Sequence, residues 1–257
     1  MQVQMILQTA VAPRPIALAS TIDKNGNVNL SPFSFFNLFS SNPPILIFSP
    51  ARRVRDNSTK DTLHNVLEVP EVVIGNVNFD MVQQVSLSST EYETGVDEFI
   101  KSGLTKKPAE LVKPPLIAES PVNFECKVIE VKPLGNEGGA GNLVICEVLK
   151  IHIREEFLNE EGNLDQKKLD LVSRLGGNWY GRTTAETLFE VPKPLVTKGI
   201  GFDQLPSEIK NSKIFTGNDL GMLANVEQLP EGNFTADENL HLEAQKLLLE
   251  GKIEEAW

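Results

Sequence analysis

The chain has 257 residues, a formal net charge of −11 and 40% hydrophobic residues, enough apolar side chains for a substantial core. A pI near 4.9 excludes the broad basic face that binding to a nucleic-acid backbone requires. No apolar run approaches the length that spans a bilayer, which excludes a membrane-spanning helix.

The opening segment, MQVQMILQTAVAPRP, is a short lead-in with a strand or a helical turn. It has no basic start and only a short, interrupted apolar run, so we do not expect a secretory signal. The two cysteines, Cys126 and Cys146, lie in strand-like segments, which favours buried reduced thiols over a disulfide or a redox pair. We therefore expect a cytoplasmic protein with no membrane partner.

Residues 16–30 predict two strands joined by a tight turn. Apolar residues alternate with small or polar ones from Ile16 to Ile22, the period of a strand with two distinct faces. Asn25 and Gly26 supply the two positive-φ positions of a hairpin turn, and the alternation resumes at Val28.

Residues 31–62 combine features that suit a mononucleotide. Ser and Asn side chains interleave with phenylalanines over 31–37, which suits a planar polar ring, and a buried strand follows at 45–48. Four cations then fall within nine residues, before a helix that begins at about residue 60 with Ser58 or Thr59 as its cap. Cations beside a helix N-terminus suit a phosphate. The alternative is a solvated charge run above an ordinary aromatic core.

The remaining segments predict further strands with short helices between them. We expect a strand over VPEVVIGNV, residues 69–77, helices at 78–90 and 97–102, and two long strands, VNFECKVIEV and NLVICEVLKIHIR. The glycines of PLGNEGGAGN lack nucleotide-loop spacing and join two strands, so this segment is a hairpin connection. An acidic, then helical stretch covers 155–175, and the chain ends in a helix over 236–257. Without a regular βαβ rhythm, the pattern indicates an antiparallel barrel.

Several successive motifs resemble the flavin reductase-like family of FMN-binding split barrels. They are PRPIALASTIDKNGNVNLSPFSFFN, NPPILIFS, STKDTLHN, GVDEFIKSGLT, KPPLIAESPVNFECKV, NLVICEVLKIHI and RLGGNWY, and they extend in order from Pro13 to Tyr180. The resemblance implies a mainly β fold, an antiparallel, Greek-key-like split barrel with peripheral helices. It divides the chain into a barrel over 1–195 and a C-terminal extension with a terminal helix over 196–257.

The resemblance also implies an FMN at a homodimer interface, with its phosphate at the STKDT helix start. Ser20 and Thr21 would face the ring and the ribityl chain. Main-chain groups at Ser34, Phe35, Phe36 and Asn37 would contact the isoalloxazine. The residues that would hold the ribityl chain and phosphate are Ser49, Arg53, Lys60, Asp61 and Thr62. The choice among Arg52, Arg53 and Arg55 stays open, because the family varies here.

Two further positions have both functional and structural interpretations. His152 ends a strand where similar flavin reductases have a histidine near the flavin and the nicotinamide, although a histidine at a strand end is often structural. Trp179 and Tyr180 follow Gly176 and Gly177, where backbone can approach closely, so they would either reach the flavin or decorate a glycine turn. The three histidines lie far apart in sequence and no carboxylate cluster has ligand spacing, so we expect no metal site.

Two functions follow from the resemblance. The first is an FMN-dependent oxidoreductase that passes hydride from NADH or NADPH to the flavin and on to a small acceptor, with positioning and electrostatics as the protein's contribution. The second is an FMN-binding or electron-transfer protein without catalysis of its own.

Overall fold

The computed structural model describes residues 2–257, with only the backbone of Gln2. The chain divides into two compact units: unit 1, which ends at Leu188, and unit 2, Phe189–Trp257. The division falls a few residues before the predicted boundary at 195. The family motifs all lie in unit 1, and each unit contains a hydrophobic core.

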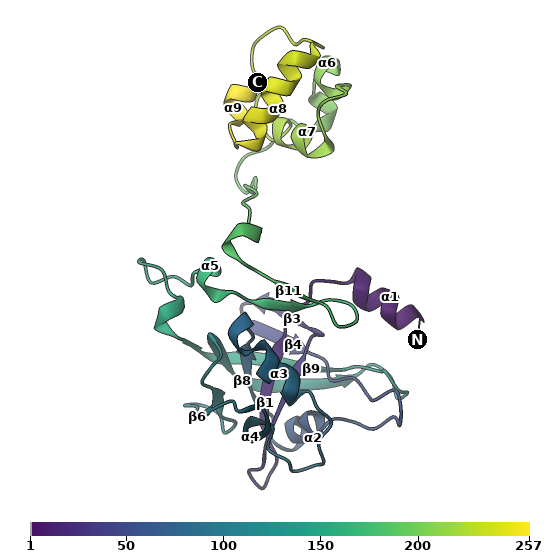
Figure 1. The fold of residues 1–257 in the computed structure, drawn as a ribbon, viewed down its shortest axis with the longest axis vertical. Helices are drawn as coiled ribbons and strands as arrows, with labels where there is room; N and C mark the ends of the chain where they lie inside the picture. The colour runs from purple at the N-terminus through teal and green to yellow at the C-terminus, as the bar shows by residue number, and fades with distance from the viewer. Residues whose placement is uncertain (1) are drawn as a thin grey trace. The chain divides into compact units, whose positions relative to one another are not determined.

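Eleven strands and nine α-helices form in the described residues (Figure 1). The strands are β1 Ala17–Ile22, β2 Val28–Phe33, β3 Phe36–Ser41, β4 Pro44–Phe48, β5 Glu71–Asn76, β6 Lys106–Lys107, β7 Leu116–Ile117, β8 Val122–Pro133, β9 Asn142–Ile153, β10 Val172–Arg174 and β11 Tyr180–Arg182. The helices are α1 Gln2–Ala10, α2 Asp61–Glu68, α3 Val82–Ser88, α4 Glu98–Ser102, α5 Gln166–Leu169, α6 Ser207–Lys210, α7 Gly217–Leu223, α8 Glu238–Leu249 and α9 Ile253–Ala256.

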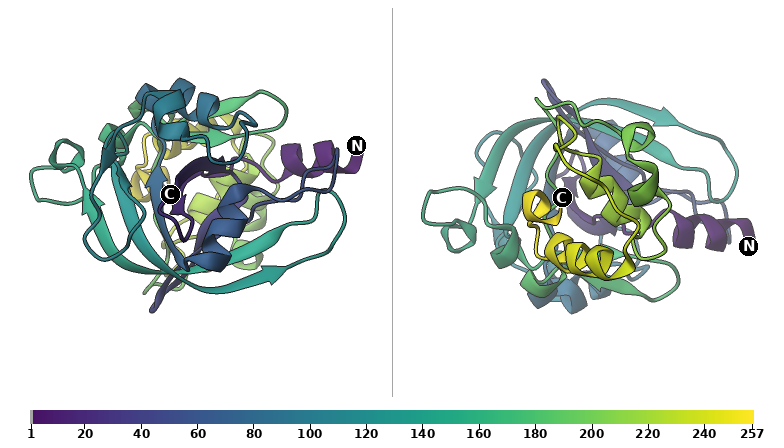
Figure 2. Two further views of the ribbon diagram at one scale, coloured as in Figure 1. Left: turned by 90° about the horizontal axis from the view of Figure 1, so that it is seen from below. Right: turned by 90° about the horizontal axis from the view of Figure 1, so that it is seen from above.

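The main sheet of unit 1 has seven strands in the order β2-β1-β5-β8-β9-β4-β3, and every neighbouring pair is antiparallel. Strands β2 and β3 are the two edges of this order, yet only Ser34 and Phe35 separate them in the chain. The sheet therefore curls until its edges approach one another. Figure 2 shows the long strands β8 and β9 curving along the outside of unit 1.

Two parts of the predicted fold need correction. The strand pairs formed by the described residues include no pairing between β2 and β3, so hydrogen bonds do not close the sheet into a barrel. The fold is also mixed α/β rather than mainly β, because helices accompany the sheet in unit 1 and unit 2 contains helices but no strand of the main sheet.

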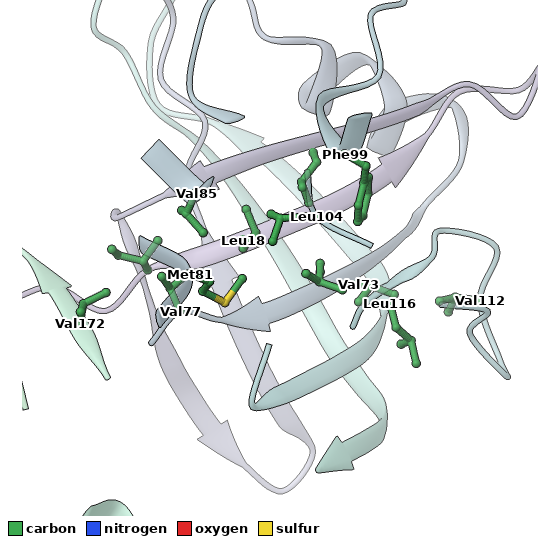
Figure 3. Close-up of a cluster of buried hydrophobic side chains, with 13 residues drawn as sticks. Leu18, Val73, Val77, Met81, Val85, Phe99, Leu104, Val112, Leu116 and Val172 are labelled. Carbon is green, nitrogen blue, oxygen red and sulfur yellow. The ribbon is translucent and has the colours of Figure 1, made fainter. Parts of the chain in front are cut away.

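Strand β1 is buried on both faces, as its small and apolar residues allow. Ile16 and Leu18 belong to one core cluster, which Val73 of β5 and Phe99 of α4 share (Figure 3). Ala17 and Ala19 point to the opposite face, into a second cluster that contains Phe48. The period-2 alternation therefore marks two buried faces.

The strand pair and the following helix form as predicted, with two local corrections. In the β1–β2 turn only Gly26 has a positive φ (+86°), because the Asp23 carboxylate accepts the backbone N–H groups of Asn25 and Asn27 and sets the turn without a second such residue. Lys60, not Ser58 or Thr59, is the cap residue of α2, and it makes no side-chain capping bond.

The two predicted cap hydroxyls have other partners. Ser58 Oγ donates to Asp56 Oδ1 (2.6 Å), and Thr59 Oγ1 lies 2.7 Å from His64 Nε2. The N-terminal N–H groups of α2 therefore receive no side-chain oxygen from these residues.

The segment PLGNEGGAGN is the connection between β8 and β9, as predicted. It also fixes the basic loop that precedes α2: Arg52 N–H donates to Ala140 O (2.8 Å), and Gly139 N–H donates to Arg52 O (2.9 Å). A Cβ at Gly138 would lie 3.0 Å from Val54 Cα, so this close approach requires glycine.

Unit 2 packs α6, α7 and α8 around a small core that includes Ile209, Leu223 and Leu248. The predicted terminal helix is two helices, since Gly251 (φ +76°) ends α8 before α9 begins. Leu248 is buried in this core, whereas Leu242 and Leu249 are exposed. Among residues 2–257, no helix is both long and apolar enough to cross a membrane.

Candidate functional site

Unit 1 has a hollow of about 580 Å³ with largely apolar walls, which we call the apolar hollow. Five predicted site residues line it: Ser34, Phe35, Phe36, Asn37 and Ser49. Arg14 at the end of the lead-in and Leu143 of β9 form further parts of its wall. The aromatic stretch predicted to contact a planar ring therefore does border a cavity.

The β2–β3 connection and the end of β4 position these residues. Ser49 N–H donates to Phe35 O (2.8 Å), which holds the connection against the end of β4. A Cβ at Gly141 would lie 2.5 Å from Ser49 Oγ, so glycine leaves room for that hydroxyl. Arg14 is buried, donates to backbone carbonyls of Val11 and Leu175, and has an Nε without a partner among the described residues.

A second, much smaller hollow of about 30 Å³ is lined by four more of the predicted residues: Arg53, Lys60, Asp61 and Thr62. We call it the cationic hollow. Lys60 Nζ lies 5.7 Å from the centre of the Phe33 ring, and no carboxylate of the described residues forms an ion pair with it. Burial, and then the charge of Arg53, lowers the pKa of Lys60. Arg53 and Lys60 are thus the two basic residues of a hollow that Asp61, Glu91 and Glu98 also line.

A hydrogen-bonded chain closes the floor of the cationic hollow. Thr62 Oγ1 donates to Asn29 Oδ1 (2.7 Å), and Asn29 Nδ2 donates to Glu98 Oε1 (2.9 Å). The other Glu98 oxygen accepts Leu30 N–H (2.9 Å), and burial raises the pKa of Glu98. The Thr62 hydroxyl is fully buried and its proton is already donated, so it acts by fixing the floor rather than as a free donor.

The structure separates the three arginines of the basic loop. Arg52 closes the loop on itself through Asn57, with Nε 2.6 Å from Asn57 Oδ1. Arg55 is 74% exposed and pairs with Asp56 and Glu91. Only Arg53 lines the cationic hollow, where Nη1 donates to Ser58 Oγ (2.9 Å) and Thr59 O (3.0 Å).

The two hollows lie close to one another in unit 1. Ser31 lines the cationic hollow and Ser34 the apolar hollow, three residues further along an extended stretch, or about 10 Å. The Phe33 and Phe48 rings, 5.2 Å apart, fill the core between these positions. Neighbouring segments of the chain therefore line the two hollows.

Ser20 and Thr21 do not lie with these residues. Both are fully buried in β1 and line neither hollow. Thr21 Oγ1 accepts Asn65 Nδ2 of α2 (3.1 Å), while Ser20 Oγ is buried without a partner among the described residues. The prediction that their side chains face a ring and ribityl chain needs correction, because β1 is buried on both faces.

His152 also lies elsewhere, in a hollow of about 300 Å³ beside Asn123 and Arg154. Leu143, which lines the apolar hollow, is nine residues away along β9, on the order of 25 Å. His152 Nε2 contacts the fully buried Glu125 Oε1 at 2.5 Å. Within one chain, therefore, the predicted catalytic histidine is separate from the apolar hollow.

Tyr180 lines a third small hollow, with Phe79 and Arg182. Its ring stacks under the Arg174 guanidinium, 4.7 Å from the ring centre, and Trp179 is 74% exposed. The structure of one chain does not bring Tyr180 to the other predicted cofactor residues. The backbone at Gly176 does approach another part of the chain closely, since a Cβ there would lie 2.3 Å from Thr9 Oγ1 of α1. This contact is with α1 and not with the apolar hollow.

The two cysteines do not supply a reactive thiol to the site. Cys126 and Cys146 are free and buried, and burial raises the pKa of Cys126 to about 12 and that of Cys146 well above its ordinary value. Both thiols are therefore protonated and unreactive at neutral pH. Residues 2–257 contain no group of three or more His, Cys, Asp or Glu side chains placed to hold a metal ion.

The sequence did not indicate several residues of these hollows. Asn29, Glu91 and Glu98 line the cationic hollow, and Arg14 lines the apolar one. Glu91 comes from a polar segment outside the quoted motifs, and Glu98 lies within GVDEFIKSGLT, but only the fold brings either of them to the basic loop. Arg14 lies within the motif that begins PRPIALAS, and its position between two prolines was the sequence signal that could have indicated it.

Comparison with known proteins identifies the family. Residues 10–170 match the Flavin reductase like domain, which is more than half of the chain. The chain belongs to the flavin reductase-like family. An uncharacterized protein from Halalkalibacterium halodurans is 38% identical over 195 residues, which cover 75% of this chain and 91% of that protein. The family match ends before unit 2 begins.

Solved structures agree with this assignment. Nitrilotriacetate monooxygenase component B from Bacillus cereus is similar with a TM-score of 0.68 and 26% identity, covering 74% of this chain and 93% of that one. A Shewanella frigidimarina protein described as having a split barrel domain has a TM-score of 0.64 and 23% identity, covering 74% and 90%, and this likeness shows the fold alone. The resemblance to the flavin reductase-like family is therefore confirmed.

Proposed function

We propose that this protein binds FMN and works as an oxidoreductase that passes hydride from NADH or NADPH to the flavin and on to a small acceptor. The observation that carries the proposal is the cationic hollow, where Lys60 lies beside Arg53 with no ion-pair partner among residues 2–257, close to an apolar hollow lined by Phe35 and Phe36. Family membership supports the flavin, and the cations favour a phosphorylated flavin over riboflavin.

The residues fit FMN part by part. The phosphate would take the cationic hollow, held by Arg53 and Lys60 with the first turn of α2 beneath it. The isoalloxazine would lie in the apolar hollow against Phe35 and Phe36. The walls that face it also contain hydrogen-bonding groups, on Ser34, Asn37 and Ser49.

The bound flavin would supply hydride and electron chemistry, and the protein's contribution is binding and electrostatics. Apolar walls would limit water at the ring, and backbone N–H groups of the β2–β3 connection would be the donors at its edge. Arg14 is the charged residue of this hollow and would favour negative charge on the ring. No protein acid is required for hydride transfer, so we do not expect one residue to abolish turnover.

We propose that the working unit is a homodimer in which the partner completes the flavin site. Leu38 and Phe39 of β3 and Ile6 and Leu7 of α1 are each more than half exposed, which is unusual for large apolar side chains that gather near a cavity. A ligand that binds only the assembled form stabilises assembly. Light scattering of apo and FMN-loaded protein over a dilution series tests this, and a monomer that binds FMN fully at every concentration would refute it.

A partner chain is also the route by which His152 and Tyr180 could meet a flavin, since neither reaches the apolar hollow of its own chain. His152 and Tyr180 are proposed as site residues on the condition that a partner chain brings them to the flavin. If His152 helps to place the nicotinamide, His152→Ala should raise the Michaelis constant for NADH or NADPH while FMN affinity holds. Unchanged kinetics in a stable variant would leave only its structural role.

The test of the main function begins with the purified protein. Its absorption spectrum, with the flavin extracted and identified, reports the cofactor, and oxidation of NADH or NADPH with added FMN reports the activity. FMN should bind more tightly than riboflavin. Equal affinities, or no binding of either, would overturn the proposal.

The second candidate is an FMN-binding or electron-transfer protein with no nicotinamide chemistry. The exposed Phe39 side chain in the wall of the apolar hollow favours it, because a ring bound near an exposed edge can exchange electrons with a docked protein. Tight FMN binding without NADH or NADPH oxidation would select this function.

A further inference from the structure

The cationic hollow contains a carboxylate that no part of the proposed function uses. Glu91 lies between α3 and α4, in the segment 89–97, and its two oxygens bind two different arginines. Oε1 is 3.2 Å from Arg53 Nε, and Oε2 is 3.1 Å from Arg55 Nη2. Glu91 thus binds Arg53, one of the two cations that would receive a phosphate, together with the exposed Arg55 beside it.

The placement of Glu91 is supported from several sides. Thr94 Oγ1 donates to Asp61 Oδ1 (3.2 Å), which ties the same segment to the first turn of α2. Tyr92 and Thr90 line the hollow together with Glu91, and Lys101 Nζ lies over the Tyr92 ring at 5.4 Å. The segment therefore forms one wall of the cationic hollow, with its carboxylate directed at the arginines.

The charges define what this wall does. A flavin phosphate carries about two negative charges at neutral pH, so it attracts Arg53 and repels Glu91. Binding must either displace Glu91 from Arg53 or hold two anions side by side. Either outcome lowers the net affinity for phosphate, whereas a ligand without phosphate loses nothing.

We propose that Glu91 is an internal stand-in for the flavin phosphate: it neutralises Arg53 and Arg55 while the site is free and competes with the phosphate when FMN binds. The inference rests on the proposed FMN binding and deepens it. Its consequence is a flavin that exchanges, because a carboxylate that can return to Arg53 promotes departure of the phosphate. Glu91 is thus a residue that sets specificity and residence time, not a catalytic residue.

Glu91→Gln tests this, with Glu93→Gln as the matched control, since Glu93 is an exposed carboxylate of the same segment with no ion pair among the described residues. Each protein is titrated with FMN and with riboflavin, followed by flavin fluorescence at low and at high ionic strength. Glu91→Gln should tighten FMN binding about three- to tenfold at low salt, the scale of two partly exposed ion pairs, and slow FMN dissociation. The riboflavin affinity of Glu91→Gln and the FMN affinity of Glu93→Gln should both match wild type. Added salt should reduce the difference in FMN affinity between Glu91→Gln and wild type.

A double-mutant cycle identifies the partner. In an Arg53→Ala background, Glu91→Gln should change FMN affinity less than it does in the wild type, because the competing pair is already lost. Weaker FMN binding in Glu91→Gln would overturn the inference and make Glu91 a support that positions Arg53. An equal gain in FMN affinity for Glu93→Gln would also overturn the inference, because the effect would then come from the change in net charge alone. No FMN binding in wild type would overturn the proposed function itself, whereas normal binding with no Glu91 effect would overturn only this inference.

Discussion

Unit 1 contains two clusters of charged residues that look alike in sequence but differ in how far their charges are paired. Glu125 is fully buried and accepts four hydrogen bonds, from the backbone N–H groups of Glu110, Leu111 and Val112 and from His152. Among the described residues Lys60 has no ion-pair partner, and Glu91 is the one carboxylate that pairs with its neighbour Arg53. A cluster in which every charged group has hydrogen-bond or ion-pair partners stabilises the fold. A cluster with an unpaired charge can bind a ligand instead.

The largest expected effect tests the satisfied cluster. Glu125→Gln should lower the free energy of unfolding by about 2–4 kcal/mol, because an amide cannot accept from three backbone N–H groups and His152 together. FMN affinity should not change. Urea unfolding and FMN titration measure the two quantities, and Glu130→Gln, an exposed carboxylate on the same strand, is the matched control. A stable Glu125→Gln variant that fails to bind flavin would reverse the assignment of the two clusters.

The same residue predicts a pH dependence. Burial raises the pKa of Glu125, but the hydrogen bonds from Glu110, His152, Leu111 and Val112 outweigh burial, so its folded-state pKa lies below the ordinary value. Its stabilisation is therefore complete above an unfolded pKa of about 4.3 and is lost as pH falls through the lower folded-state pKa. Unfolding curves below about pH 4.5 should show a steeper loss in wild type than in Glu125→Gln. Parallel curves would contradict this.

The next effect tests the unsatisfied cluster. Lys60→Ala should weaken FMN binding by about 1–3 kcal/mol, the scale of a charged hydrogen bond, and leave riboflavin binding unchanged. Stability should hold or rise, because the variant removes a partly buried cation beside Arg53. Lys24→Ala, an exposed lysine, serves as the control. An equal loss for FMN and riboflavin would place the phosphate away from Lys60.

These clusters also show how much of the site could be predicted from the sequence. The motifs from Pro13 to Tyr180 predicted the family, and nine of the twelve predicted cofactor residues line the two adjoining hollows. Ser20 and Thr21 failed because alternation in β1 cannot distinguish a solvent face from a second core. His152 and Tyr180 line other hollows of the chain, and their place at the flavin stays a proposal that depends on a partner chain.

Neither Glu91 nor the hydrogen bonds of Glu125 could be predicted. Both depend on contacts between segments far apart in sequence, over 36 positions for Arg55 with Glu91 and 27 for Glu125 with His152. Similarly, the prediction of Ser58 as the helix cap was wrong because the Ser58 hydroxyl donates to Asp56 instead. Capping propensity alone does not predict such a competing local hydrogen bond.

A smaller effect concerns the apolar hollow, which should not distinguish phosphorylated from unphosphorylated flavin. Phe35→Ala should weaken FMN and riboflavin equally, by about 1 kcal/mol, the extra contribution of one aromatic contact. Phe35 is 44% exposed, so its loss should cost little stability. Phe189→Ala, at a more exposed position in unit 2, is the control. A loss confined to FMN would mean that the ring does not lie against Phe35.

The smallest expected effect concerns unit 2. The family match ends at residue 170, and the Halalkalibacterium relative matches over 91% of its own length while covering only 75% of this chain. Unit 2 has a core of its own around Leu223 and Leu248, and every residue that lines either hollow belongs to unit 1. A chain that ends at Leu188 should therefore fold and bind FMN within about twofold of the full chain, since no contact to the ligand is removed.

That result would confine flavin binding to unit 1 and leave unit 2 an accessory role. The measurement is FMN titration of the truncated and full-length proteins, with circular dichroism and urea unfolding as checks that unit 1 is intact. Because unit 2 contributes twelve acidic and six basic side chains by sequence, its removal also makes the net charge less negative. A general charge effect would then tighten FMN slightly at low salt and vanish at high salt. A tenfold or greater loss of affinity in a folded truncated protein would instead mean that unit 2 takes part in the site.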